Sequence, residues 1–149
     1  MDLGVRTGLA LFGDDGRVRW YRSRNFGSAA RLRRAVPALL DEPGDVVRLV
    51  IEGGGPLAEP WRREAARRDV LVRQIGAEDW RRPLLLPREQ RDGERAKREA
   101  GVLARRIIEW SGAARPTSLR HDAAEAVLVG LWGVLEAGWL RALPAGLLR

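Results

Sequence analysis

The sequence lacks cysteine altogether and has one histidine, His121, among its 149 residues. Without cysteine, a disulfide framework, a thiol nucleophile and a cysteine-ligated zinc or iron–sulfur site are excluded. A single histidine likewise excludes a centre built from several imidazoles. Long uninterrupted apolar runs are also missing, because Glu125 breaks the most apolar stretch, 123–135. We therefore expect a buried helix there, and neither a membrane span nor a secretory signal.

Lysine is almost absent, since Lys97 is the only lysine among 27 basic residues. The 27 basic residues outnumber the 20 acidic ones, which gives a formal net charge of +7. This excess predicts a polyanionic partner, with nucleic acid as the leading candidate. Because 45% of the residues are hydrophobic, the chain has enough apolar surface for a core. We expect one domain over 1–149, located in the cytoplasm.

The order of expected elements predicts a mixed α/β fold. An antiparallel meander opens the chain, with strands at 1–5, 8–12 and 18–22 and a turn at Asp14-Asp15-Gly16. A helix capped by Ser28, a strand at 46–51, a helix at 61–68 and a strand at 70–75 follow. The stretch 80–90 is predicted to be a loop or a linker. A helix at 91–110, ended by Gly112 and Pro116, follows, and then a buried helix that starts at 118 or 121. Together these elements predict a five-stranded sheet with helices on both faces.

Four acidic residues occupy positions from which they can converge. Asp2 lies in the first expected strand, and Glu52 ends the most apolar strand, ahead of three glycines. Asp122 and Glu125 are three residues apart and share one face of a helix. If the first and fourth strands pair, Asp2 and Glu52 become neighbours, and the last helix can add its two acids. The alternative for Asp122 and Glu125 is a capping box at the start of the helix.

Four carboxylates in one place require a cation, because like charges this close do not all ionise unaided. Oxygen ligands favour Mg²⁺ or Mn²⁺. Two such ions about 4 Å apart would serve an in-line phosphoryl displacement. Together with the basic surface, this indicates a phosphodiesterase that acts on nucleic acid.

The order of these motifs resembles the RuvC-type Holliday junction resolvases. Residues 2–10, Asp-Leu-Gly-Val-Arg-Thr-Gly-Leu-Ala, are similar to the opening Asp-x-Gly…Thr-Gly of that family. Residues 50–52, Val-Ile-Glu, resemble its fourth-strand Ile-Glu. Residues 122–126, Asp-Ala-Ala-Glu-Ala, resemble its Asp-Ala-Ala-Asp-Ala near the C-terminus.

The resemblance implies a ribonuclease H-like fold, a homodimer and Mg²⁺- or Mn²⁺-dependent symmetric nicking of four-way DNA junctions, with two ions per site. It also implies a bacterial or phage source and no small-molecule cofactor. Asp2, Glu52, Asp122 and Glu125 take the four metal-ligand positions, and Lys97 takes that of a catalytic lysine near the scissile phosphate. The residues expected to contact nucleic acid are Arg6, Thr7, Gly53, Gly54, Leu57, Arg91, Arg95, Lys97, Arg98 and His121. For Lys97, the alternative is a solvated charge on a helix.

The chain departs from the family pattern at several positions. Glu125 stands where Asp is usual, and its longer side chain can shift the second ion. His121 comes one residue before the third ligand, about 100° away on a helix, so we expect a neighbouring or phosphate contact. Leu57 is the nearby candidate for a side chain that intrudes into a junction. Asp2 has almost no strand before it.

Three other functions fit parts of the pattern. A YqgF-like nuclease acting on RNA shares the opening Asp-x-Gly and a late acidic helix but usually lacks the glutamate that stands here at Glu52. An actin-like ATPase shares the phosphate loop but needs two such subdomains, for which 149 residues are too few. A catalytically inert DNA-binding dimer would be basic and folded but would hold no metal.

Overall fold

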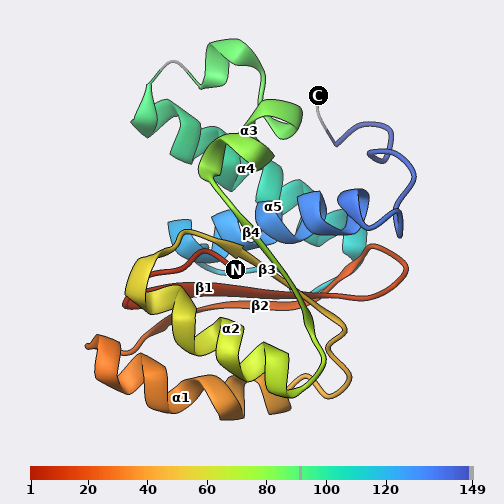
Figure 1. Ribbon diagram of the computed structural model, residues 1–149. Coiled ribbons are helices and arrows are strands. Elements are labelled where there is room, and N and C mark those ends of the chain that lie inside the picture. Colours follow the sequence, from red (N-terminus) through yellow and green to blue (C-terminus); the bar gives the residue numbers. More distant parts are fainter. Residues whose placement is uncertain (91, 148–149) are drawn as a thin grey trace.

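The computed structural model of the protein describes residues 1–90 and 92–147 (Figure 1). Its strands are β1 (Arg6–Phe12), β2 (Val18–Asn25), β3 (Arg48–Glu52) and β4 (Leu71–Ile75). Its α-helices are α1 (Ala29–Asp41), α2 (Ala58–Arg67), α3 (Ala77–Leu84), α4 (Gly93–Ser111) and α5 (His121–Glu136). Single 3₁₀ turns lie at Gly55–Leu57 and Pro87–Glu89. The predicted mixed α/β class is confirmed.

The strands form two pairs instead of the expected five-stranded sheet. β1 and β2 are antiparallel, while β3 and β4 are parallel. The expected first strand, 1–5, is reduced to isolated bridges at Asp2, because the chain turns back into β1 at once, with the Thr7 hydroxyl donating to the Gly4 carbonyl at 2.6 Å. Beyond these bridges an apolar cavity of about 150 Å³ is lined by residues of both β1 and β3. The described residues therefore contain four strands, with Asp2 bridging the two pairs where the fifth was expected.

The hairpin turn between β1 and β2 lies where the sequence predicts it. The Gly13 amide donates to the Arg17 carbonyl at 2.9 Å, and Gly16 has a φ of 75°, which favours glycine. Both strands extend beyond their predicted ends, since β1 begins at Arg6 and β2 continues to Asn25.

Helices cover both faces of the strands, as predicted (Figure 1). On one side α1 and α2 enclose a buried cluster that includes Leu32 and Trp61. On the other side α3, α4 and α5 enclose a larger cluster that includes Ile107 and Leu131. β3 contributes to both clusters through successive residues, Val50 and Ile51, as the alternation of side chains along a strand requires. No helix among the described residues is long and apolar enough to cross a membrane.

The stretch 80–90, expected to be a loop, instead contains most of α3. The helix begins after Gly76, whose amide donates to the Asp79 carboxylate at 2.8 Å. Trp80 and Leu84 from this helix are buried in the core. Pro83 removes a backbone amide only near the end of the helix. The free energy that this costs the helix is therefore small compared with the free energy gained by burying Trp80. Tertiary packing thus overrides the local signal of the prolines.

Candidate metal centre

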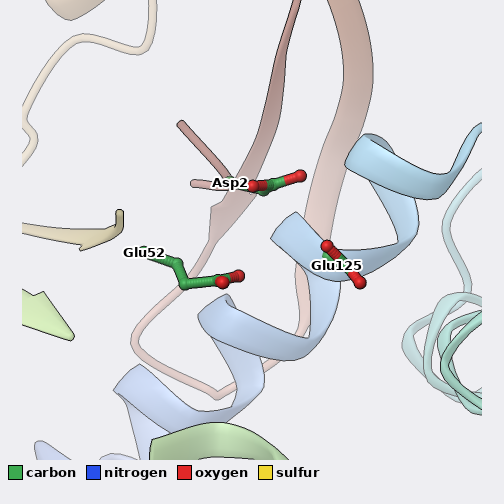
Figure 2. A group of neighbouring side chains, drawn as sticks. All are labelled: Asp2, Glu52 and Glu125. Carbon is green, nitrogen blue, oxygen red and sulfur yellow. The ribbon is translucent and has the colours of Figure 1, made fainter. Parts of the chain in front are cut away.

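Three of the four candidate acids meet at one end of the strands. Carboxylate oxygens of Asp2, Glu52 and Glu125 lie within 4.8 Å of one another. Figure 2 shows the three carboxylate groups around a common space. Asp2 comes from the N-terminal segment, Glu52 from the end of β3 and Glu125 from α5. This is the convergence that the sequence analysis anticipated for these residues.

Backbone hydrogen bonds fix Asp2 beside Glu52. The Glu52 amide donates to the Met1 carbonyl at 2.9 Å, and the Leu3 amide donates to the Glu52 carbonyl at 3.0 Å. On its other side Asp2 exchanges two hydrogen bonds with Gly8 of β1. Residues 1–3 therefore lie between β1 and β3, and the expected pairing of the first and fourth strands is present as a single parallel bridge.

The first turn of α5 rests directly on β1. A Cβ atom added at Gly8 would lie 1.8 Å from the carbonyl oxygen of Asp122, so only glycine permits this approach. The helix begins at His121 after Arg120, and Asp122 lies inside the first turn. The capping-box interpretation, with Asp122 at the N-cap, is therefore wrong. The close approach brings the next residue on that helix face, Glu125, over the strand ends.

Asp122 does not belong to the group of three. Its Oδ2 atom accepts a hydrogen bond from the Ser23 hydroxyl of β2. The carboxylate nevertheless lies close enough to contribute to the raised pKa of Asp2. A fourth carboxylate is therefore adjacent, but it is hydrogen-bonded to a neutral partner.

Burial and neighbouring carboxylates raise the pKa of two of these acids, Asp2 and Glu52. Burial, with the added effect of Glu125 and Glu52, raises the pKa of Asp2 to about 7. Burial also raises the pKa of Glu52, although the Trp80 indole opposes this by hydrogen bonding to the charged form. The Met1 amine beside them is buried and its pKa falls to about 5. The site thus binds a proton readily when no other cation is present.

Two neighbouring residues of α3 hold the carboxylates, and neither was singled out from the sequence. Trp80 Nε1 donates to Glu52 Oε2 at 3.1 Å, and an Arg81 guanidinium nitrogen lies 3.3 Å from Glu125 Oε1. Sequence reasoning missed both residues because the stretch was predicted to be a loop. Ser23, the partner of Asp122, was missed too, since it lies just beyond the expected strand 18–22 and a lone serine carries no signal of its own.

Lys97 lies on α4 and contacts a neighbour on the same helix. Its ammonium is 3.3 Å from a Glu94 carboxylate oxygen, and both side chains are exposed. Arg95 and Arg98 are exposed on the same helix. Arg91, also expected to contact phosphates, lies outside the described residues.

The other residues expected to contact nucleic acid divide into exposed and buried ones. Arg6, Gly53, Gly54 and His121 are exposed. Thr7 is fully buried and its hydroxyl closes the turn to Gly4, so the expected direct contact with nucleic acid is corrected to a structural role.

Leu57 was considered as a side chain that intrudes into a junction. It is partly buried and packs against the cluster under α1 and α2. In the described conformation, the Leu57 side chain is therefore not free to insert into a junction.

The donor set fits a hard divalent cation. The three groups offer only carboxylate oxygens, the ligands that Mg²⁺ and Mn²⁺ prefer. Their oxygens are already within 4.8 Å of one another, so small side-chain rotations bring all three to a common ion. The described positions assemble one such site, while a second requires Asp122 as well.

A scan against protein-family models and a search of curated proteins each return no match to the chain.

Proposed function

We propose that this protein is a RuvC-type endonuclease that nicks four-way DNA junctions with the help of Mg²⁺ or Mn²⁺. The observation that carries the proposal is the convergence of Asp2, Glu52 and Glu125 at the end of the strands. These are residues from the three sequence segments that resemble the family, and they lie far apart along the chain.

The fold supports the same proposal. An antiparallel hairpin is followed by a parallel strand pair, with helices on both faces, as in a ribonuclease H-like arrangement with a shortened first strand. The carboxylates lie at the carboxyl end of the parallel strand β3, where α/β proteins commonly hold their ligands.

The residues of the site have separate roles in this proposal. A divalent ion supplies charge stabilisation at the scissile phosphate and lowers the pKa of water. Asp2, Glu52 and Glu125 hold the ion, with Asp122 available for a second one. Loss of the proton from Asp2, whose pKa is raised to about 7, makes this carboxylate available as a ligand. No covalent intermediate with the protein is needed.

The basic surface binds the phosphates of the substrate. Arg95, Lys97 and Arg98 on α4 supply positive charge on the helix layer that also contains α5. Such contacts provide affinity without reading the base sequence. A homodimer, which places two sites on opposite strands of a junction, accounts for symmetric nicking.

The test is cleavage of a synthetic four-way junction in Mg²⁺ or in EDTA. Glu52→Gln keeps the size of the side chain but removes the charge, so we expect nicking to fall by at least a hundredfold while junction binding persists. Glu59→Gln is the matched control, because Glu59 is an exposed glutamate on α2 that pairs with Arg62 and, among the described residues, with no other cation. Its activity should equal that of the unmodified protein.

The same assay separates the alternatives. Full activity of Glu52→Gln would refute the proposal. Metal-dependent cleavage of RNA hairpins but not of junctions would favour a YqgF-like nuclease. Junction binding without cleavage in any metal would leave an inert DNA-binding protein.

A further inference from the structure

Helix α3 returns the chain to the carboxylates immediately after the strand that pairs with β3. Ile75, the last residue of β4, lies beside Glu52 in the parallel register. Gly76 then starts α3, and its first turns place Trp80 and Arg81 over the same end of the strands. Two consecutive residues thereby reach two different carboxylates, those of Glu52 and Glu125.

Arg81 is the only side-chain cation paired with a member of the three-carboxylate group in the described residues. Its guanidinium lies 3.3 Å from Glu125, whose side chain is 15% exposed, while that of Arg81 is 31% exposed. The charged group also packs against the Trp80 ring, 5.1 Å from its centroid. Its Nε atom, however, is buried with no hydrogen-bond partner.

This pairing is incompletely satisfied. Moving a guanidinium whose donors are all hydrogen-bonded would leave buried donors unpaired, and each unpaired donor costs free energy comparable to a lost hydrogen bond. Arg81 already has one buried, unpaired donor, its Nε atom, so moving its guanidinium adds less of this cost. It also keeps a route to solvent, because nearly a third of its side chain is exposed. The guanidinium can therefore leave Glu125 at modest cost.

We propose that Arg81 is an internal counter-ion that holds Glu125 when no metal is bound and competes with the divalent cation for that carboxylate. The inference rests on the metal site of the proposed function. Arg81 and the cation both offer positive charge to Glu125. The guanidinium that already neutralises Glu125 therefore opposes binding of the cation, since two positive charges compete for one carboxylate.

Trp80 has a different role in this arrangement. Its indole is neutral and donates to one oxygen of Glu52, which leaves the other oxygen free for a ligand. It orients the carboxylate without competing for charge. Trp80 is therefore a positioning residue, while Arg81 sets how tightly a cation is held.

The test is the affinity for Mn²⁺, measured by calorimetry on the full chain. We expect Arg81→Gln to bind Mn²⁺ about fivefold more tightly, the factor that corresponds to loss of one partly exposed ion pair. Arg82→Gln is the matched control, because the next residue carries the same charge on the same helix, is exposed and makes no ion pair with the described carboxylates. Its affinity should change by less than twofold. Arg81→Lys, which keeps the charge, should stay within about twofold of the unmodified protein.

Thermal unfolding gives a second readout that does not depend on activity. In EDTA, Arg81→Gln should melt at a lower temperature, because the carboxylates lose their counter-ion. In Mn²⁺ it should gain more stability than the unmodified protein does, since tighter binding to the folded state raises the melting temperature further. A variant that simply folds less well would lose stability in both conditions.

The outcomes distinguish this inference from the proposed function. Equal affinities for Arg81→Gln and Arg82→Gln, or weaker binding by Arg81→Gln, would overturn the role of Arg81 while leaving a metal-dependent nuclease intact. Tighter binding by Arg81→Gln in a protein that cleaves no junction would support Arg81 and overturn the nuclease. Absence of Mn²⁺ binding in every variant would overturn both.

Discussion

The backbone of Asp2 pairs with that of Glu52 in a parallel β-bridge, which places two carboxylates side by side at the end of the strands. Glu125 joins them from α5 because a glycine, Gly8, lets that helix lie against β1. The candidate metal centre therefore depends on backbone contacts as much as on the acids themselves.

Metal affinity should increase as the pH rises through 7. The raised pKa of Asp2, about 7, means that protons occupy this carboxylate below that pH and compete with the ion. Mn²⁺ titrations at pH 6 and pH 8 test this, and the higher pH should give the lower dissociation constant. A pH-independent affinity would show that Asp2 is not a ligand.

The same pKa predicts how the metal-free protein responds to pH. The folded state holds a proton on Asp2 up to about pH 7, whereas the unfolded chain releases it near the ordinary value of 3.8. The contribution of Asp2 to stability is therefore greatest below pH 4 and decreases as the pH rises to 7. The Met1 amine, with its lowered pKa of about 5, contributes with the opposite sign. Urea unfolding in EDTA at several pH values gives the Asp2 part as the difference from Asp2→Asn, in which the contributions of the amine and of Glu52 remain.

Gly8→Ala should destabilise the fold and reduce nicking together. The new methyl group would meet the Asp122 carbonyl at 1.8 Å, which forces α5 away from β1. We expect a loss of about 2 kcal/mol in the free energy of unfolding, as for overpacking of a buried contact. Gly101→Ala on α4 is the control, since no atom lies within 4 Å of its added Cβ. That variant should gain about 0.5–1 kcal/mol, because alanine favours a helix interior over glycine. Equal effects of the two substitutions would contradict the close approach at Gly8.

Asp122→Asn should change how many ions bind and leave the first one in place. Asp2, Glu52 and Glu125 form their group without Asp122, which is bonded to Ser23. In calorimetry we expect two Mn²⁺ ions per chain for the unmodified protein and one for Asp122→Asn, with the affinity of the tighter site preserved. Loss of both ions in the variant would place Asp122 in the first site instead.

Removing a phosphate contact should flatten the salt dependence of junction binding. Each contact contributes about 0.9 to the slope of log affinity against log salt concentration. Lys97→Gln on α4 should reduce that slope by about this amount. Arg34→Gln is the control, because Arg34 is exposed on α1, on the other side of the strands. Equal slopes for Lys97→Gln and the unmodified protein would leave Lys97 as a solvated charge paired with Glu94.

The sequence by itself determined most of the elements. The hairpin at Asp14-Asp15-Gly16, the Ser28 cap and the Gly112 helix end follow local rules of turn and cap chemistry, and all are present. The order of the expected strands and helices also predicted helices on both faces. The order of acidic motifs predicted that Asp2, Glu52, Asp122 and Glu125 would meet. Three of them do, while Asp122 bonds to Ser23 instead.

Only the tertiary structure decided the remainder of the site. Trp80 and Arg81 lie in a proline-containing stretch whose helix forms because the core accepts Trp80, and burial of that kind is not visible in local sequence. The bond between Ser23 and Asp122 joins residues from β2 and α5, and no spacing rule relates them. The fifth expected strand is reduced to bridges at Asp2 for a related reason, since the turn at Gly4 reverses the chain before a first strand can extend. Short-range chemistry thus fixed which residues are available, and long-range packing fixed which of their carboxylates lie within 4.8 Å of one another.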